Sequence, residues 1–180
     1  CCPSNVCRFI PAIPGYIYSV TNKDLYVNLF ASNNADIELG SRSVRIAQET
    51  NYPWEGKVTM IIDPEKAGRF TVRVRIPGWA RNEAIPGNLY SFAGQSEEKH
   101  KLIVNGAKID APIENGYAVI TRKWQAGDRI ELDIPMPVRT VVADEQVKED
   151  EGKYAVQRGP LMFCAEWPDN ADGHVLGLVV

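Results

Sequence analysis

Strict alternation of apolar and polar side chains constrains the fold of this 180-residue chain more than any other feature. In FTVRVRIP, Phe70, Val72, Val74 and Ile76 fall on one side of an extended segment, and Thr71, Arg73 and Arg75 fall on the other. RIELDIP repeats the pattern, with Ile130, Leu132 and Ile134 on the apolar side. A period of two with one wet face is typical of antiparallel sheets. Asn105-Gly106 and Asn115-Gly116 add turn signals, because both residue types tolerate positive φ.

These short strands and regularly spaced turns predict an all-β fold, an antiparallel β-sandwich or jelly roll. Only the start departs from the pattern. Pro3 suits a first helical position, and Val6, Phe9, Ile10 and Ile13 have helical spacing before Pro14 and Gly15. A helix this short is not stable alone. We therefore interpret it as left over from a helical body, and the lack of an initiating Met as a sign of a processed chain or a fragment.

The predicted organisation has three parts. Residues 1–15 form the terminal helix, residues 16–143 form the β-sandwich, and residues 144–180 continue the sandwich or begin a second one that is cut short. The polar segment from about residue 86 to 101 is expected to be a long loop or a short helix.

Charge and hydropathy limit the kinds of partner that the chain is expected to bind. The formal net charge is -3 and the basic residues form no stripe, which argues against a nucleic-acid partner. No apolar run reaches membrane-spanning length, so no membrane partner is expected. The sequence does not specify the cellular compartment, and the bacterial cytoplasm or periplasm is the favoured interpretation. A sandwich separated from a helical body would expose apolar surface, so self-association is a further expectation.

The opening CCPSNVC places two thiols before Pro3, at the start of the predicted helix. The positive end of a helix dipole lowers the pKa of a nearby thiol, and thiolates bind zinc. From spacing alone, a purely structural role for Cys1 and Cys2 and a role as metal ligands or nucleophile are equally favoured. Cys7 and Cys164 are interpreted as packed side chains. No Ser-His-Asp arrangement and no HExxH or nucleotide-binding motif is found.

Several motifs occur in one order: CCPSN, TNYPWEGKV, FTVRVRIPGWA, LIVNG, GYAVITRKWQAGDRIEL and YAVQRGPLMFCAEWPDN. Together they resemble the C-terminal part of the β-L-arabinofuranosidases of glycoside hydrolase family 127. The resemblance implies an (α/α)₆ barrel upstream, of which residues 1 to about 15 are the last helix, followed by the sandwich. It also implies a glycan substrate and a retaining mechanism.

The resemblance also assigns roles to the opening thiols. Cys1 matches the nucleophile and a zinc ligand, and Cys2 matches a second zinc ligand. The remaining ligands and the acid/base glutamate belong to the upstream barrel. We therefore expect zinc in the complete enzyme, no cofactor in this chain alone, and no hydrolysis by it.

The alternative is a non-catalytic module that binds carbohydrate or has a structural role. Its candidate contacts are Trp54, Trp79 and Trp124, since tryptophans near turns can stack on sugar rings. Packing inside the sandwich or against a barrel is the favoured interpretation of all three, and it is weakest for Trp54.

Overall fold

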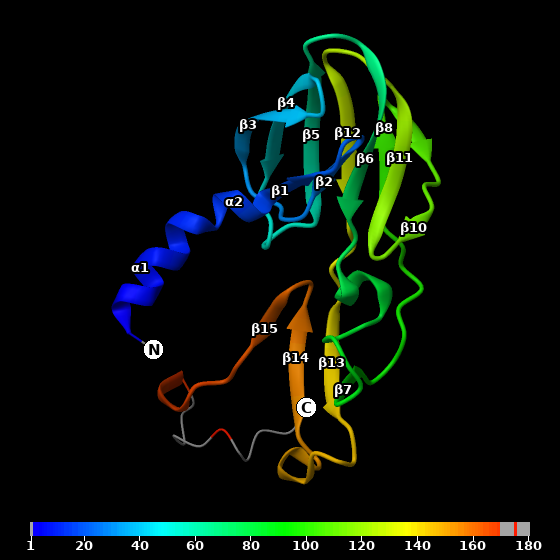
Figure 1. Cartoon of the computed structure of the whole chain (residues 1–180). Helices are drawn as coiled ribbons and strands as arrows, with labels where there is room; N and C mark the ends of the chain where they lie inside the picture. Colours follow the sequence, from blue (N-terminus) through cyan, green and yellow to red (C-terminus); the bar gives the residue numbers. More distant parts are fainter. Residues whose placement is uncertain (1, 170–174, 176–180) are drawn as a thin grey trace. The chain divides into compact units, whose positions relative to one another are not determined.

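The computed structural model describes residues 2–169 and residue 175 (Figure 1). The chain divides into two compact units, which are described separately. Unit 1 comprises Cys1–Pro77 and His100–Ile134, and unit 2 comprises Gly78–Lys99 and Pro135–Val180. The three-part division predicted from the sequence stays a prediction. No helix in the described part of the chain is long and apolar enough to cross a membrane.

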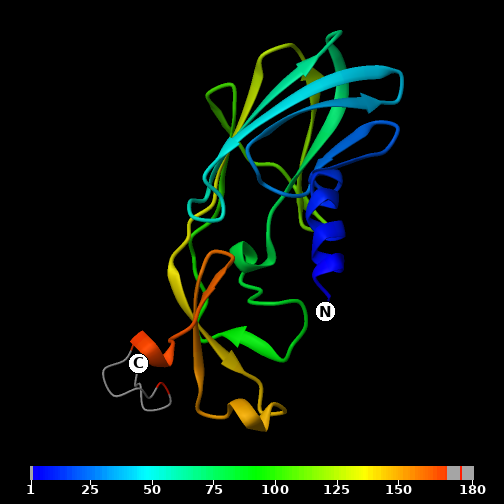
Figure 2. The same cartoon turned by 90° about the vertical axis from the view of Figure 1, so that its left-hand side faces the viewer.

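Unit 1 begins with the predicted helix, divided into α1 (Pro3–Ala12) and α2 (Pro14–Ile17). Figure 2 shows α1 leading through α2 into the first strand. Cys2 is the N-cap residue of α1, with extended backbone angles, and Pro3 follows in the first turn, where its missing N–H costs nothing. The prediction that Cys7 packs is wrong, because Cys7 is exposed on this helix.

The first sheet of unit 1 has five strands in the order β1-β2-β6-β11-β10. Their bounds are β1 (Tyr18–Val20), β2 (Asp24–Val27), β6 (Gly68–Arg75), β10 (Ile113–Glu114) and β11 (Tyr117–Trp124). All neighbours are antiparallel except β2 and β6, which run parallel. The long strand β6 thus joins the N-terminal hairpin to the rest of the sheet.

The second sheet has six antiparallel strands in the order β3-β4-β5-β12-β8-β9. They are β3 (Asn33–Leu39), β4 (Arg42–Thr50), β5 (Lys57–Pro64), β8 (Lys101–Val104), β9 (Ala107–Ile109) and β12 (Asp128–Asp133). Asn105-Gly106 closes the β8–β9 hairpin with φ of 51° and 81°, as the sequence predicts. Asn115-Gly116 does the same between β10 and β11, with φ of 50° and 81°.

The two sheets of unit 1 face each other and bury the alternating apolar side chains between them (Figure 1). Val72 and Val74 of β6 are fully buried, as are Ile130 of β12 and Ile46 of β4. The alternate burial along β6 and β12 follows from the pleat, because successive side chains point to opposite faces. The predicted all-β sandwich with a short N-terminal helix is confirmed.

Unit 2 holds a four-stranded antiparallel sheet in the order β15-β14-β13-β7. Its strands are β7 (Tyr90–Phe92), β13 (Val138–Ala143), β14 (Tyr154–Arg158) and β15 (Leu161–Phe163). Short 3₁₀ turns are η1 (Gly78–Arg81), η2 (Lys148–Asp150) and η3 (Trp167–Asp169). Strand β7 lies within the segment expected to be a loop or a short helix.

The prediction that Cys164 is buried is wrong, because Cys164 is exposed.

Candidate functional site

The predicted zinc and nucleophile site lies at the start of α1. Cys2 takes φ of −76° and ψ of 145°, and its carbonyl oxygen accepts a hydrogen bond of 2.9 Å from the Asn5 backbone N–H. Its thiol makes no capping bond and is exposed. Cys1, the predicted nucleophile, lies outside the described residues. Its role, and the pairing of Cys1 with Cys2, stay predictions.

Zinc takes about four ligands from Cys, His, Asp or Glu. Across residues 2–169 and residue 175, no group of three such side chains lies close enough to hold a metal. The exposed Cys2 thiol has the right chemistry for one zinc ligand. A complete site would therefore need further ligands from outside the described residues.

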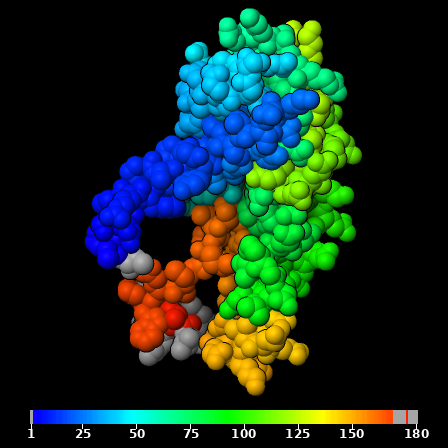
Figure 3. All heavy atoms as spheres, viewed as in Figure 1, coloured from blue at the N-terminus to red at the C-terminus, as the bar shows by residue number. Residues whose placement is uncertain are grey.

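An apolar surface continues along α1 from the predicted site. Val6, Phe9, Ile10 and Ile13 are exposed, and Phe9 retains 60% of its accessible surface. The space-filling view shows α1 (blue) with its side chains at the surface (Figure 3). No residue of α1 is buried. An apolar face of this kind is typical of a surface that another part of a protein covers.

The three tryptophans considered as sugar platforms have different environments. Trp124 is fully buried, and its Nε1 donates to the Phe70 carbonyl oxygen at 3.1 Å, so the packing interpretation is confirmed. Trp79 is partly buried, with its Nε1 shielded from solvent. Trp54 is 66% exposed. Of the three, Trp54 therefore presents the largest accessible fraction to a ligand.

The loop that carries Trp54 is well ordered by backbone contacts. The N–H groups of Trp54 and Glu55 both donate to the Asn51 carbonyl oxygen, at 2.9 and 3.2 Å. The Tyr52–Pro53 peptide bond is cis. The Tyr52 ring packs edge-on against Phe30, with 5.4 Å between ring centroids. The exposed indole thus projects from a fixed turn.

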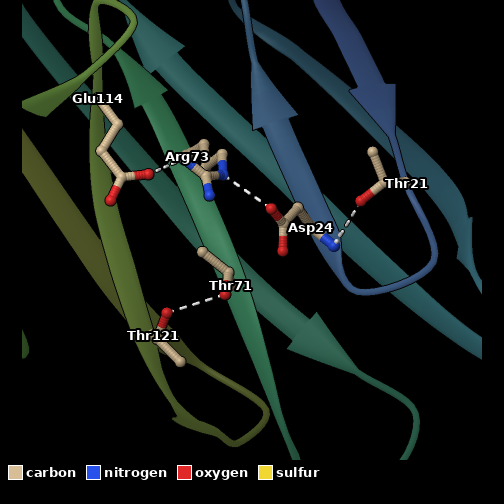
Figure 4. A network of polar contacts seen from close by, with 6 residues as sticks. All are labelled: Thr21, Asp24, Thr71, Arg73, Glu114 and Thr121. Carbon is tan, nitrogen blue, oxygen red and sulfur yellow. Dashed lines mark hydrogen bonds and ion pairs between the residues drawn. The ribbon is translucent and has the colours of Figure 1, made fainter.

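A polar network covers the outer face of the five-stranded sheet (Figure 4). The Arg73 guanidinium donates to Asp24 at 2.8 Å and to Glu114 at 2.9 Å. These contacts raise the pKa of Arg73, chiefly through the hydrogen bond to Glu114. The alternation in FTVRVRIP placed Arg73 on the wet face, but its carboxylate partners come from two other strands and could not be chosen from the sequence.

His100 is the histidine that the structure describes. Burial lowers its pKa, and the nearby negative charge of Asp110 partly offsets that shift.

Two family sequence models match consecutive parts of the chain. The sequence model described as "Beta-L-arabinofuranosidase, GH127 middle domain" matches residues 24–136. The model described as "Glycoside hydrolase family 127 C-terminal domain" matches residues 138–179. The chain is thus a C-terminal part of a glycoside hydrolase. It belongs to glycoside hydrolase family 127, which confirms the resemblance found in the sequence.

Three relatives show the extent of the similarity. The chain is 33% identical to a non-reducing end β-L-arabinofuranosidase of Bifidobacterium longum subsp. longum, over 94% of this chain and 24% of the relative. A solved GH127 β-arabinofuranosidase is 44% identical with a TM-score of 0.90, over 95% of this chain and 27% of the other. A GH127 β-L-arabinofuranosidase from Geobacillus stearothermophilus T6 is 42% identical with a TM-score of 0.81, over 94% and 24%. The chain therefore spans about a quarter of the length of these relatives.

Proposed function

We propose that the chain is the C-terminal part of a retaining, zinc-dependent glycoside hydrolase that acts on β-L-arabinofuranosides or related glycans. The observation that carries this proposal is the consecutive match of the GH127 middle and C-terminal domains to residues 24–136 and 138–179, downstream of the Cys1-Cys2-Pro3 start. The named activity of the relatives supplies the substrate class.

In this proposal Cys1 is the nucleophile. Zinc, when bound by Cys1 and Cys2 together with ligands outside this chain, would keep the Cys1 thiol ionised near neutral pH. The Cys1 sulfur bonds to the anomeric carbon as the bond from that carbon to the leaving oxygen breaks, and a carboxylic acid outside this chain gives its proton to that oxygen. Water then displaces the sulfur, and two successive inversions retain the configuration.

The sheets have a bracing role in the same proposal. The exposed apolar face of α1, formed by Val6, Phe9, Ile10 and Ile13, packs against the other helices of the α/α barrel, and α1 thereby joins the sheets to that barrel. The chain alone is then inactive, since the acid/base and half of the zinc ligands lie on that barrel. In the isolated chain the same face favours self-association.

The experiment replaces Cys1 by Ser in a longer protein that includes this chain and its upstream barrel. Hydrolysis of an aryl β-L-arabinofuranoside should fall at least about a thousandfold, because an un-ionised hydroxyl is a poor nucleophile. Cys7→Ser is the matched control, since it removes another thiol of the N-terminal segment, one that is exposed on α1. Full activity of the Cys1→Ser protein would refute the nucleophile assignment.

A non-catalytic carbohydrate-binding role is the second candidate, favoured by the exposure of Trp54 on its ordered loop. Titration of the chain with arabino-oligosaccharides, followed by tryptophan fluorescence, tests it. A saturable change that disappears in Trp54→Ala would support this role. Unchanged fluorescence would leave bracing as the function of the sheets.

A further inference from the structure

A cavity of about 400 Å³ opens at the edge of unit 1 where the β1–β2 turn, the β3–β4 turn and strands β6 and β11 meet. Three cationic side chains line it: Lys23, Arg42 and Arg69. None of the residues that line it is acidic. A concave site with one sign of charge concentrates ligands of the opposite sign.

The Arg42 guanidinium is held in place by the backbone of β6. Its Nη1 donates to the Arg69 carbonyl oxygen at 3.1 Å. A Cβ on residue 68 would lie 2.4 Å from the same nitrogen, so the guanidinium occupies space that Gly68 leaves open. A guanidinium has five N–H donors, and this contact uses one of them. The remaining donors of Arg42 are thus pre-positioned for an acceptor.

The charge of the pocket is not neutralised by neighbouring carboxylates. In the part of the chain that the structure describes, Lys23, Arg42 and Arg69 form no ion pair. Asp24, which follows Lys23, is instead bound by Arg73 at 2.8 Å (Figure 4). Lys123 is the cross-strand partner of Arg69, which adds a further positive charge beside the pocket.

Two hydroxyls lie on the same wall of the pocket. The Oγ1 atoms of Thr71 and Thr121 are 2.8 Å apart and hydrogen-bonded to each other across β6 and β11 (Figure 4). One hydroxyl of such a pair keeps a free proton, and both keep acceptor capacity. The wall can therefore exchange hydrogen bonds with the hydroxyls of a ligand whose charged group lies on the arginines.

We propose that this pocket binds the carboxylate of an acidic sugar. Arg42 and Arg69 would contact the carboxylate, since a guanidinium matches its two oxygens. Thr71 and Thr121 would contact ring hydroxyls, and the volume suits a single sugar residue. The choice of an acidic sugar among oxyanions rests on the proposed function as a glycan-acting protein. The pocket would then direct the enzyme to acidic glycans.

The test is calorimetric titration of the chain with D-glucuronate at low ionic strength, with glucose as the neutral probe. We expect saturable binding of glucuronate and none of glucose. Arg42→Gln and Arg69→Gln should each raise the Kd about tenfold, as loss of one charge-assisted contact predicts. Gly68→Ala should also raise it, by displacing the Arg42 guanidinium without changing the charge. Arg45→Gln is the matched control, because Arg45 lies on the same strand and pairs with Asp36 at 2.9 Å.

Three results would overturn the proposal. They are no saturable heat with glucuronate, inorganic sulfate binding as tightly as glucuronate, and an equal loss of affinity in Arg45→Gln and Arg42→Gln. Failure of the chain to bind glucuronate would leave the proposed hydrolytic function untouched, because the two depend on different residues. Hydrolysis of a neutral arabinofuranoside by a longer protein depends on Cys1 and is expected to be unchanged by Arg42→Gln.

Discussion

A Cβ on residue 56 would lie 1.8 Å from the carbonyl oxygen of Ile134, so the backbone there has room only for glycine. The Ile134 N–H donates to the Gly56 carbonyl oxygen at 3.0 Å, which joins the segments flanking β5 and β12. Gly56→Ala must push these backbones apart. We expect it to lower the free energy of unfolding by about 3 kcal/mol, measured by urea denaturation.

The matched control is Gly15→Ala, because a Cβ at Gly15 meets nothing within 4 Å. Gly15 lies in α2, where alanine is the better helix former. Its substitution should change stability by no more than about 1 kcal/mol and in the stabilising direction. Equal effects of the two substitutions would show that the close approach at Gly56 does not constrain the fold.

The Trp124 ring is fully buried beside Phe70, with 5.9 Å between ring centroids. Trp124→Ala should cost about 3–5 kcal/mol, because it leaves a cavity and removes the hydrogen bond to Phe70. Trp54→Ala, at an exposed position, should cost about 0.5 kcal/mol or less. Chemical denaturation followed by far-UV circular dichroism compares the two. A larger loss for Trp54→Ala would contradict the burial seen here.

His100 should make stability depend on pH in the weakly acidic range. Its pKa is lower in the folded protein than its ordinary value of 6.5, mainly through burial, so the unfolded chain binds more protons at intermediate pH. Its contribution is present above pH 6.5 and is lost as pH falls through the folded pKa. The free energy of unfolding should therefore rise from pH 5 to pH 7, with a smaller rise in His100→Gln. An identical slope in both proteins would contradict this assignment.

A substitution on the apolar face of α1 tests whether that face is covered in a longer protein. In the isolated chain Phe9→Ala should change the unfolding free energy by about 0.5 kcal/mol or less, because Phe9 is exposed. In a longer protein with the barrel the same substitution should cost about 3 kcal/mol, the usual loss for a buried Phe. Ser4→Ala, at another exposed position of α1, should have a small effect in both. Equal small effects of Phe9→Ala in the two proteins would argue against bracing.

The local pattern of the sequence predicts much of unit 1. Alternation in FTVRVRIP and RIELDIP identifies β6 and β12 and their buried faces, because the pleat alone fixes which side chains share a face. It does not identify the parallel pairing of β2 with β6, which depends on contacts between segments distant in sequence. The short strand β7 was missed for the same reason, since its pairing with β13 specifies it.

The errors at Cys7 and Cys164 have a different cause. Both residues stand among apolar neighbours, and such neighbours predict burial only if another surface covers that face. In this chain those faces are exposed. The roles of Cys1 and Cys2 came from resemblance and stay predictions, because two thiols at a helix start do not by themselves specify a metal or a reaction.

The residue that a substrate-like inhibitor modifies identifies the nucleophile directly. A longer protein with the barrel is treated with an electrophilic β-L-arabinofuranosyl analogue that alkylates the nucleophile, and its peptides are mapped by mass spectrometry. We expect one adduct, on the sulfur of Cys1, that excess arabinofuranoside prevents. An adduct on a carboxylate, with Cys1 unmodified, would contradict it.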